Sequence, residues 1–172
     1  MDMISTHLTG RKLYTLVILH MQDEHKVLLG LKKRGLGVGK WNGFGGKVEP
    51  GETIEEGAIR EMQEESSVLT PQLEKAGIVF NVLAGNPIAN EIHVFRATAF
   101  SGTPGESDEM IPCWFPIAEI PFEQMWIEAR IWWPYFFTGK PFVGVFQFSE
   151  SKIENYTLEY VETLPSSIEF RD

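Results

Sequence analysis

Three glutamates, Glu61, Glu64 and Glu65, are spaced so that they can act together on one ligand. Thr53, followed three residues later by Glu56, forms a capping box, which predicts a helix from about Thr53 to about Glu65. At about 100° per residue along such a helix, the three carboxylates lie on one face. The sequence therefore predicts a helix with a concentrated negative charge on one side.

This acidic face has two interpretations. Neighbouring carboxylates repel one another by a few tenths of a kcal/mol per pair, and Mg²⁺ or Mn²⁺ would balance them while also binding the phosphates of a substrate. Gly57 lies within the same face, where a missing side chain would leave room for the metal or a phosphate. Alternatively, the face is merely solvated and Gly57 permits close packing, and the helix alone does not decide between the two.

The helix lies within a longer string that resembles the Nudix box, the sequence pattern of the Nudix hydrolases. The matching positions are Gly46, Glu52, Arg60, Glu61, Met62, Glu64 and Glu65. The family pattern usually has glycine near the end of the box, where this chain has Ser67. We expect this difference to affect the exit of the helix, where glycine readily adopts the left-handed conformation, rather than the metal ligands.

Much of the region from Leu13 to Val161 further resembles the MutT-like members of this family in animals, which remove oxidised purine nucleotides. The segments that carry the resemblance are 13–17, 27–30, 32–35, 41–48, 102–104, 106–110, 112–115 and 120–122. This resemblance implies an α/β fold, an α/β/α sandwich around a mixed β-sheet. It also implies hydrolysis of damaged purine nucleoside triphosphates such as 8-oxo-dGTP to the monophosphate and pyrophosphate, which sanitises the nucleotide pool.

The resemblance assigns roles in metal binding and catalysis. The implied ligands of Mg²⁺, which Mn²⁺ could replace, are the carbonyl of Gly45 and the carboxylates of Glu61, Glu64, Glu65 and Glu109. Glu65 or Glu61 would help to deprotonate the attacking water, and Arg60 would orient Glu64 or Glu61. In the acidic loop that carries Glu109, weaker candidates for metal binding are Asp108 and Glu106.

The same resemblance assigns substrate contacts. The implied contact residues are Thr15, Lys32, Asn42, Phe44, Gly46, Lys47, Phe80, Met110, Trp126, Glu128 and Phe148. The amide of Asn42 can both donate and accept hydrogen bonds, as a purine edge requires, and Trp126 offers a stacking face.

The chain departs from the family at several of the positions that surround the base. The family recognises the base with two adjacent aspartates just after the tryptophan, where this chain has Glu128 and Ala129. Leu36 and Asn90 replace a phenylalanine and a methionine of the animal proteins. Glu128 can still accept hydrogen bonds from a guanine-type edge, but recognition of several oxidised purines by paired acids is in question. The alternatives are a Nudix hydrolase of another nucleotide or dinucleotide, and a non-catalytic nucleotide-binding module, which would be expected to have lost acids of the box.

Composition sets the outer limits. The 172 residues are expected to form a single Nudix domain, 1–172, with a core at about 11–163. The net charge of −9 argues against binding to a nucleic acid polymer but permits a small nucleoside triphosphate.

Residues 1–11 lack the apolar core of a signal peptide, and no apolar run would span a membrane, so we expect a cytoplasmic monomer, with the nuclear or mitochondrial pool as further locations. Cys113 is expected to be a buried thiol.

The remaining elements follow from alternation and turn residues. We expect strands at 13–19, 27–31, 78–83, 91–100, up to 115, 141–148 and 156–161, and an aromatic helix at 127–137. The glycine-rich basic segment 32–47 runs directly into the acidic helix, so we expect it to form a wall of the substrate site. His20 and His25 are expected at the surface, and His93 is expected to be a satisfied residue of the sheet.

Overall fold

The computed structural model describes residues 8–165 of the chain. Residues 1–7, which belong to the N-terminal segment expected to lack a signal peptide, lie outside this range. The described helices are α1 (Ile54–Ser66) and α2 (Ala129–Phe137), and short 3₁₀ turns lie at Gln22–Glu24, Ile117–Glu119 and Phe122–Gln124.

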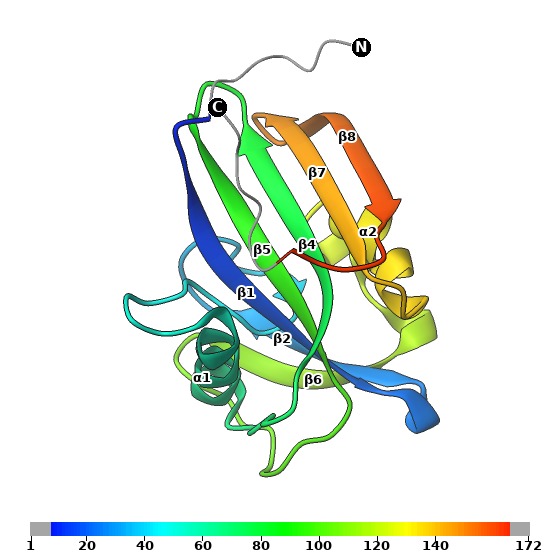
Figure 1. The fold of residues 1–172 in the computed structure, drawn as a ribbon. Coiled ribbons are helices and arrows are strands. Elements are labelled where there is room, and N and C mark those ends of the chain that lie inside the picture. Colours follow the sequence, from blue (N-terminus) through cyan, green and yellow to red (C-terminus); the bar gives the residue numbers. More distant parts are fainter. Residues whose placement is uncertain (1–7, 166–172) are drawn as a thin grey trace.

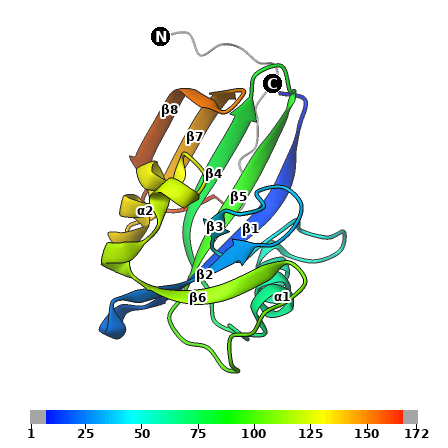
Figure 2. The same ribbon diagram turned by 180° about the vertical axis from the view of Figure 1, so that it is seen from behind.

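Within the described range, eight strands form one mixed β-sheet (Figures 1 and 2). The strands are β1 (Gly10–Met21), β2 (Lys26–Lys32), β3 (Trp41–Asn42), β4 (Glu74–Leu83), β5 (Ile88–Ala97), β6 (Met110–Pro116), β7 (Phe142–Ser149) and β8 (Lys152–Tyr160). They follow the order β3-β2-β1-β5-β4-β7-β8, and β6 pairs with β2. β1 is parallel to β5 and β4 is parallel to β7, whereas the other pairs are antiparallel.

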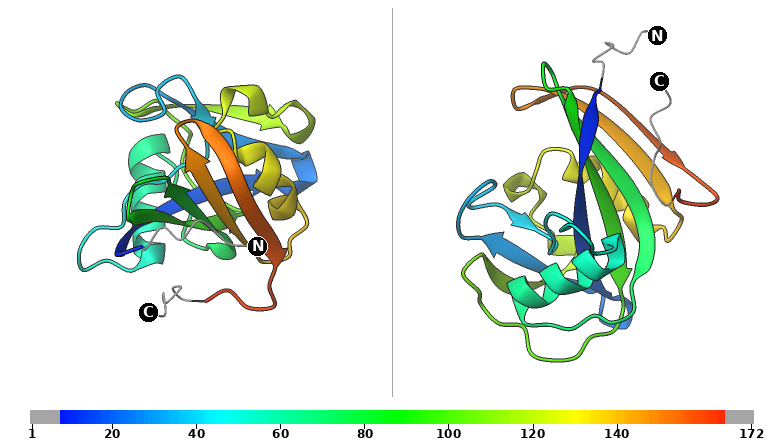
Figure 3. Two further views of the ribbon diagram at one scale, coloured as in Figure 1. Left: turned by 90° about the horizontal axis from the view of Figure 1, so that it is seen from above. Right: turned by 60° about the vertical axis from the view of Figure 1, so that its left-hand side comes forward.

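The alternation of side chains along β1 divides the core into two clusters, one on each face of the sheet. Leu16 and Ile18 belong to the cluster that contains Trp133 of α2, whereas Val17 belongs to the cluster that contains Met62 of α1. The two helices accordingly cover opposite faces of the sheet, as the two views of Figure 3 show. The expected α/β/α sandwich around a mixed sheet is confirmed.

Helix α1 begins and ends as its sequence predicts. The Thr53 hydroxyl accepts a hydrogen bond from the Glu56 amide, and the Glu56 carboxylate accepts one from the Thr53 amide, which completes the capping box. After the last turn, Ser67 adopts a left-handed conformation with a φ of 65°, and its amide donates to the carbonyl of Gln63. The replacement of the usual glycine by Ser67 therefore places a non-glycine residue in a left-handed conformation at the helix exit, as expected.

Most predicted elements are confirmed with shifted ends, and two expectations about single residues are wrong. Cys113 is exposed rather than buried, because β6 pairs only with β2 in the described residues and alternate positions of this edge, 111 and 113, face outward. His20 is buried rather than on the surface, because β1 continues to Met21 and carries this imidazole between the rings of Phe136 and Phe137. The sequence patterns also missed the two-residue strand β3.

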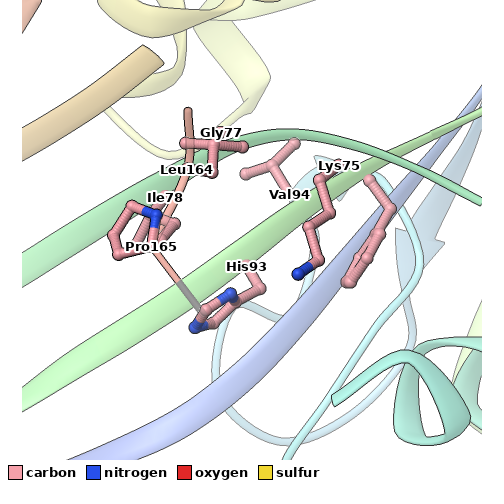
Figure 4. A pocket seen from close by; sticks show the side chains of 8 residues that line it. Lys75, Gly77, Ile78, His93, Val94, Leu164 and Pro165 are labelled. Atoms are coloured by element: carbon pink, nitrogen blue, oxygen red, sulfur yellow. The ribbon is translucent and has the colours of Figure 1, made fainter. Parts of the chain in front are cut away.

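His25 and His93 lie as expected. His25 is exposed in the turn after β1, and His93 is buried on β5, where its Nε2 lies 3.0 Å from the carboxylate of Glu91. The last described residues, Leu164 and Pro165, approach β4 and β5 near His93 (Figure 4). The small pocket at this contact is lined by none of the residues that the sequence predicts for the site.

Candidate active site

A glycine turn brings the backbone against the carboxylates of α1. The segment after β3 runs beside β1, where the amide of Thr15 donates to the carbonyl of Gly46 at 2.9 Å. A Cβ atom on Gly45 would lie 1.8 Å from the carbonyl oxygen of Thr15, and one on Gly46 would lie 2.7 Å from the carboxyl carbon of Glu61. Only glycine fits at position 45, and a side chain at position 46 would displace the carboxylate of Glu61, so the backbone of this turn lies directly against the acidic helix.

Glu65 is a buried acid at the centre of this arrangement. Its side chain points inward from the last turns of α1, it is only 4% exposed, and its Oε1 accepts a hydrogen bond of 2.8 Å from the amide of Gly45. Burial raises the pKa of Glu65 to about 7, against the opposing effect of the Gly45 hydrogen bond, and the negative charges of Glu61 and Glu109 raise it further. A carboxyl group with a pKa near neutrality is suited to accept a proton from water.

Arg60 neutralises much of the charge on the helix. Its guanidinium forms a two-pronged ion pair with Glu52, with N–O distances of 2.7 and 3.0 Å, and this pairing lowers the pKa of Glu52 to about 2. The same group lies 2.9 Å from the carboxylate of Glu61 and 3.2 Å from that of Glu64. The burial of Glu61 raises its pKa in spite of this contact. The repulsion among the acids is thus offset in part within the chain itself.

Gly57 makes room for Glu52. A Cβ atom on Gly57 would lie 2.9 Å from Oε1 of Glu52, so a larger residue would displace the carboxylate that holds Arg60. The structure therefore supports the interpretation in which Gly57 permits close packing.

The acidic loop before β6 meets the basic segment after β2. The carboxylate of Glu109 accepts hydrogen bonds from Nζ of Lys32 at 3.0 Å and from Nε of Arg34 at 2.7 Å. Lys33 pairs with Glu106 at 2.7 Å, while Asp108 is exposed. The charges of Lys32 and Glu109 both act on Glu65, so this contact borders the buried acid.

The donor groups fit a hard divalent cation, although no three acidic, histidine or cysteine side chains of residues 8–165 already converge in a cage. Of the four carboxylates that the resemblance assigns to a metal, Glu61 and Glu64 pair with Arg60, Glu109 pairs with Lys32 and Arg34, and Glu65 accepts from the Gly45 amide. Among the described residues, no hydrogen bond reaches the carbonyl of Gly45. A free carbonyl and several carboxylates on flexible side chains are the oxygen ligands that Mg²⁺ or Mn²⁺ prefers.

A second group of side chains lies on the α2 side of the sheet. The ring of Trp126 contacts the loop after β2 at Gly37, where an added Cβ would lie 2.9 Å from the indole, and Nζ of Lys40 lies 5.5 Å from the ring centroid. Glu128 is buried at the start of α2, and burial raises the pKa of this carboxyl group. Nδ2 of Asn81 donates to Oε1 of Glu128 at 3.3 Å. The basic segment between β2 and α1 thus borders both groups of side chains.

The structure does not gather every predicted contact residue at these two places. Phe44 and Met110 are buried in the core cluster on the α1 side. Phe80 is buried on β4, and the pairing of that strand places it opposite Glu91 on the α1 face, whereas its neighbour Asn81 faces α2. Thr15 is buried beside Gly46, with Oγ1 at 3.5 Å from that residue's carbonyl oxygen.

Three further predicted residues lie where a substrate could reach them. Lys47 is exposed at the glycine turn. Phe148 packs at the margin of the α2-side core, and Asn42 is half-buried with its Oδ1 accepting a hydrogen bond of 2.9 Å from the amide of Gly43. This bond leaves the amide nitrogen of Asn42 as the available donor.

Sequence reasoning missed two residues of this arrangement. Asn81 lies beside Glu128, and Arg34 holds Glu109. The alternation of β4 separates positions 80 and 81 onto opposite faces, but the sequence alone does not say which of the two faces α2.

The fold and the site belong to a known class of protein. A model of the NUDIX domain matches residues 11–136. The chain therefore belongs to the Nudix family. No helix within the described residues is long and apolar enough to cross a membrane.

Within that family, the chain is similar to two curated proteins over nearly their whole length. It is 47% identical over 154 residues to the oxidized purine nucleoside triphosphate hydrolase of Danio rerio, covering 89% of this chain and 97% of that protein. It is 45% identical over 153 residues to the protein of the same name from Mus musculus, covering 88% of this chain and 97% of that one. Among solved structures it resembles the mutator protein MutT from Bacillus halodurans, with 26% identity, a TM-score of 0.73, and coverage of 86% of this chain and 97% of that chain.

Proposed function

We propose that this chain hydrolyses oxidised purine nucleoside triphosphates such as 8-oxo-dGTP to the monophosphate and pyrophosphate, using Mg²⁺, and so sanitises the nucleotide pool. The observation that carries the proposal is the buried Glu65, which the Gly45 amide holds at the centre of a Nudix box that keeps all of its acids. The names of the relatives from Danio rerio and Mus musculus support the choice of substrate. We further propose that residues 1–172 act as one domain and as a cytoplasmic monomer.

The chemistry at the phosphates is assigned to α1 and its neighbours. Mg²⁺ bound by Glu61, Glu64, Glu65, Glu109 and the Gly45 carbonyl would neutralise phosphate charge and acidify a water molecule. Glu65 would accept the proton of the attacking water, because this buried carboxylate lies at the centre of the acidic helix face, against the Gly45 amide. Arg60 would position Glu61 and Glu64, with which it already pairs.

Recognition of the purine base is assigned to the side chains on the α2 face of the sheet. Trp126 is half-buried and offers a stacking face, and Glu128 offers a carboxylate that can accept hydrogen bonds from N–H groups of a purine. Lys32 and Arg34 contact Glu109, and the same basic segment reaches the ring of Trp126 through Lys40, so Lys32 and Arg34 would contribute positive charge for the triphosphate.

The test is a comparison of kcat/KM with Mg²⁺ across oxidised and normal purine triphosphates, dinucleoside polyphosphates and nucleotide sugars, with the products identified. We expect strong preference for an oxidised purine triphosphate. The variant Glu65→Gln should lose about 100-fold or more in kcat, whereas Glu55→Gln, an exposed change in the first turn of the same helix, should retain activity. Near-normal turnover by Glu65→Gln would refute the catalytic assignment.

A Nudix hydrolase of another nucleotide is the second candidate, because Ala129 stands where the second base-reading acid is expected. Preference for a dinucleotide or a nucleotide sugar in the same panel would establish it. Binding without turnover of any compound would instead indicate a non-catalytic module.

A further inference from the structure

The side-chain amide of Asn81 has a hydrogen-bond partner at its nitrogen and none at its oxygen among the described residues. Its Nδ2 donates to Oε1 of Glu128 at 3.3 Å, while its Oδ1 is buried and has no hydrogen-bond partner among the described residues. Leaving a buried acceptor unpaired costs about 1–3 kcal/mol. A water molecule or a ligand that donates a hydrogen to this atom would remove that cost.

The neighbouring groups hold the amide in this orientation. Turning the amide over would place its carbonyl oxygen against the carboxylate of Glu128, where two acceptors repel. Asn81 is fixed on a central strand, since β4 pairs with both β5 and β7, and its cross-strand neighbour Phe146 is fully buried. The unpaired Oδ1 is thus held in place by a strand that is paired on both sides.

The amide belongs to the end of the site that we assign to the base. Glu128 lies two residues after Trp126, and Lys40, whose charge acts on Glu128, lies over the ring of Trp126. The Glu128 carboxylate has about four acceptor positions, of which Asn81 occupies one. A ligand in this region therefore meets two neighbouring acceptors, Glu128 just before α2 and Asn81 on β4.

We infer that Asn81 is a specificity-determining residue, which supplies the second acceptor that Ala129 cannot and thereby selects bases with two adjacent N–H donors. A guanine-type pairing edge offers such a pair, N1–H and the exocyclic amine. An adenine-type edge offers one donor and one acceptor, and its N1 would face an acceptor of the protein. The inference rests on the proposed function for the identity of the ligand class.

The test measures binding of 8-oxo-dGMP and 8-oxo-dAMP by calorimetry in EDTA. The two ligands share the same oxidised ring and differ at the pairing edge. We expect the wild type to bind 8-oxo-dGMP at least about tenfold more tightly. In Asn81→Leu, which has the same branched arrangement of side-chain heavy atoms and no amide, the binding of 8-oxo-dGMP should weaken about 10- to 100-fold and the preference should fall to within about threefold.

The matched control is Asn155→Leu, the same substitution on the exposed strand β8, which should leave the preference unchanged. Equal weakening of both ligands by Asn81→Leu, or an unchanged preference, would overturn the inference. If Asn81→Leu does not fold, the inference is tested on the wild type alone. Equal affinities of the wild type for 8-oxo-dGMP and 8-oxo-dAMP would also overturn the inference. Absence of turnover with triphosphates would refute the proposed function alone, since monophosphate binding is measured without metal.

Discussion

The buried carboxyl group of Glu65 makes the metal-free protein sensitive to pH. Its pKa is raised to about 7 from an ordinary value of 4.5, mainly by burial. The folded state therefore binds the proton of Glu65 more tightly than the unfolded state does. The resulting stabilisation is fully present below pH 4.5 and is lost as the pH rises through about 7.

The size of this effect follows from the difference between the two pKa values. Each pKa unit corresponds to about 1.4 kcal/mol, so complete ionisation of Glu65 removes about 3 kcal/mol of stability. The variant Glu65→Gln stays neutral at every pH and keeps an oxygen that can accept from the Gly45 amide. In EDTA at pH 8 we therefore expect Glu65→Gln to be more stable than the wild type by about 3 kcal/mol, and at pH 5 by less than about 1 kcal/mol.

Urea unfolding in EDTA at the two pH values measures the difference directly. The control is Glu64→Gln, because Glu64 lies on the same helix but its side chain is 59% exposed, so its effect should stay within about 1 kcal/mol at both pH values. Added Mg²⁺ should stabilise the wild type at pH 8 more than it stabilises Glu65→Gln. A stability difference between wild type and Glu65→Gln that does not grow with pH would refute the reasoning.

Three further predictions concern the elements around the site. Ser67→Gly should raise the free energy of unfolding by up to about 1 kcal/mol, measured by urea unfolding, because glycine adopts the left-handed conformation at this helix exit without strain. Gly45→Ala should lower the melting temperature and abolish turnover, because its Cβ would lie 1.8 Å from the carbonyl oxygen of Thr15; a variant with unchanged melting temperature would contradict the close approach. Glu52→Gln should be less stable than the wild type at neutral pH, because Arg60 lowers the pKa of Glu52 to about 2, and the difference should shrink as the pH falls from 4.5 towards 2 in a pH series of thermal melts.

The sequence by itself determined the features that depend on local spacing. The capping box at Thr53, the helical period that places Glu61 and Glu64 with Glu65, and the exit at Ser67 involve contacts only a few residues apart. Such contacts are encoded by propensity and periodicity, and they were predicted to within a residue or two. Most strands could be predicted for the same reason, since alternation along one strand is a local pattern.

Tertiary structure decided which side of each element is buried and which distant groups meet. His20 and Cys113 have the opposite exposure to that expected, because burial depends on how far β1 extends and on which strands flank β6. Glu109 was assigned to a metal, but its contacts with Lys32 and Arg34 depend on the pairing of β2 with β6. A strand pattern fixes two faces but not their orientation, which is set by long-range pairing.

The same limit explains which residues lie beside Glu128. The sequence singled out Glu128, but the choice between positions 80 and 81 on β4 depended on the register between β4 and its neighbours β5 and β7. That register turns Asn81 toward Glu128 and Phe80 away. The acidic helix of the Nudix box is therefore encoded in local sequence, whereas the groups that lie beside Glu128 depend on how the sheet is assembled.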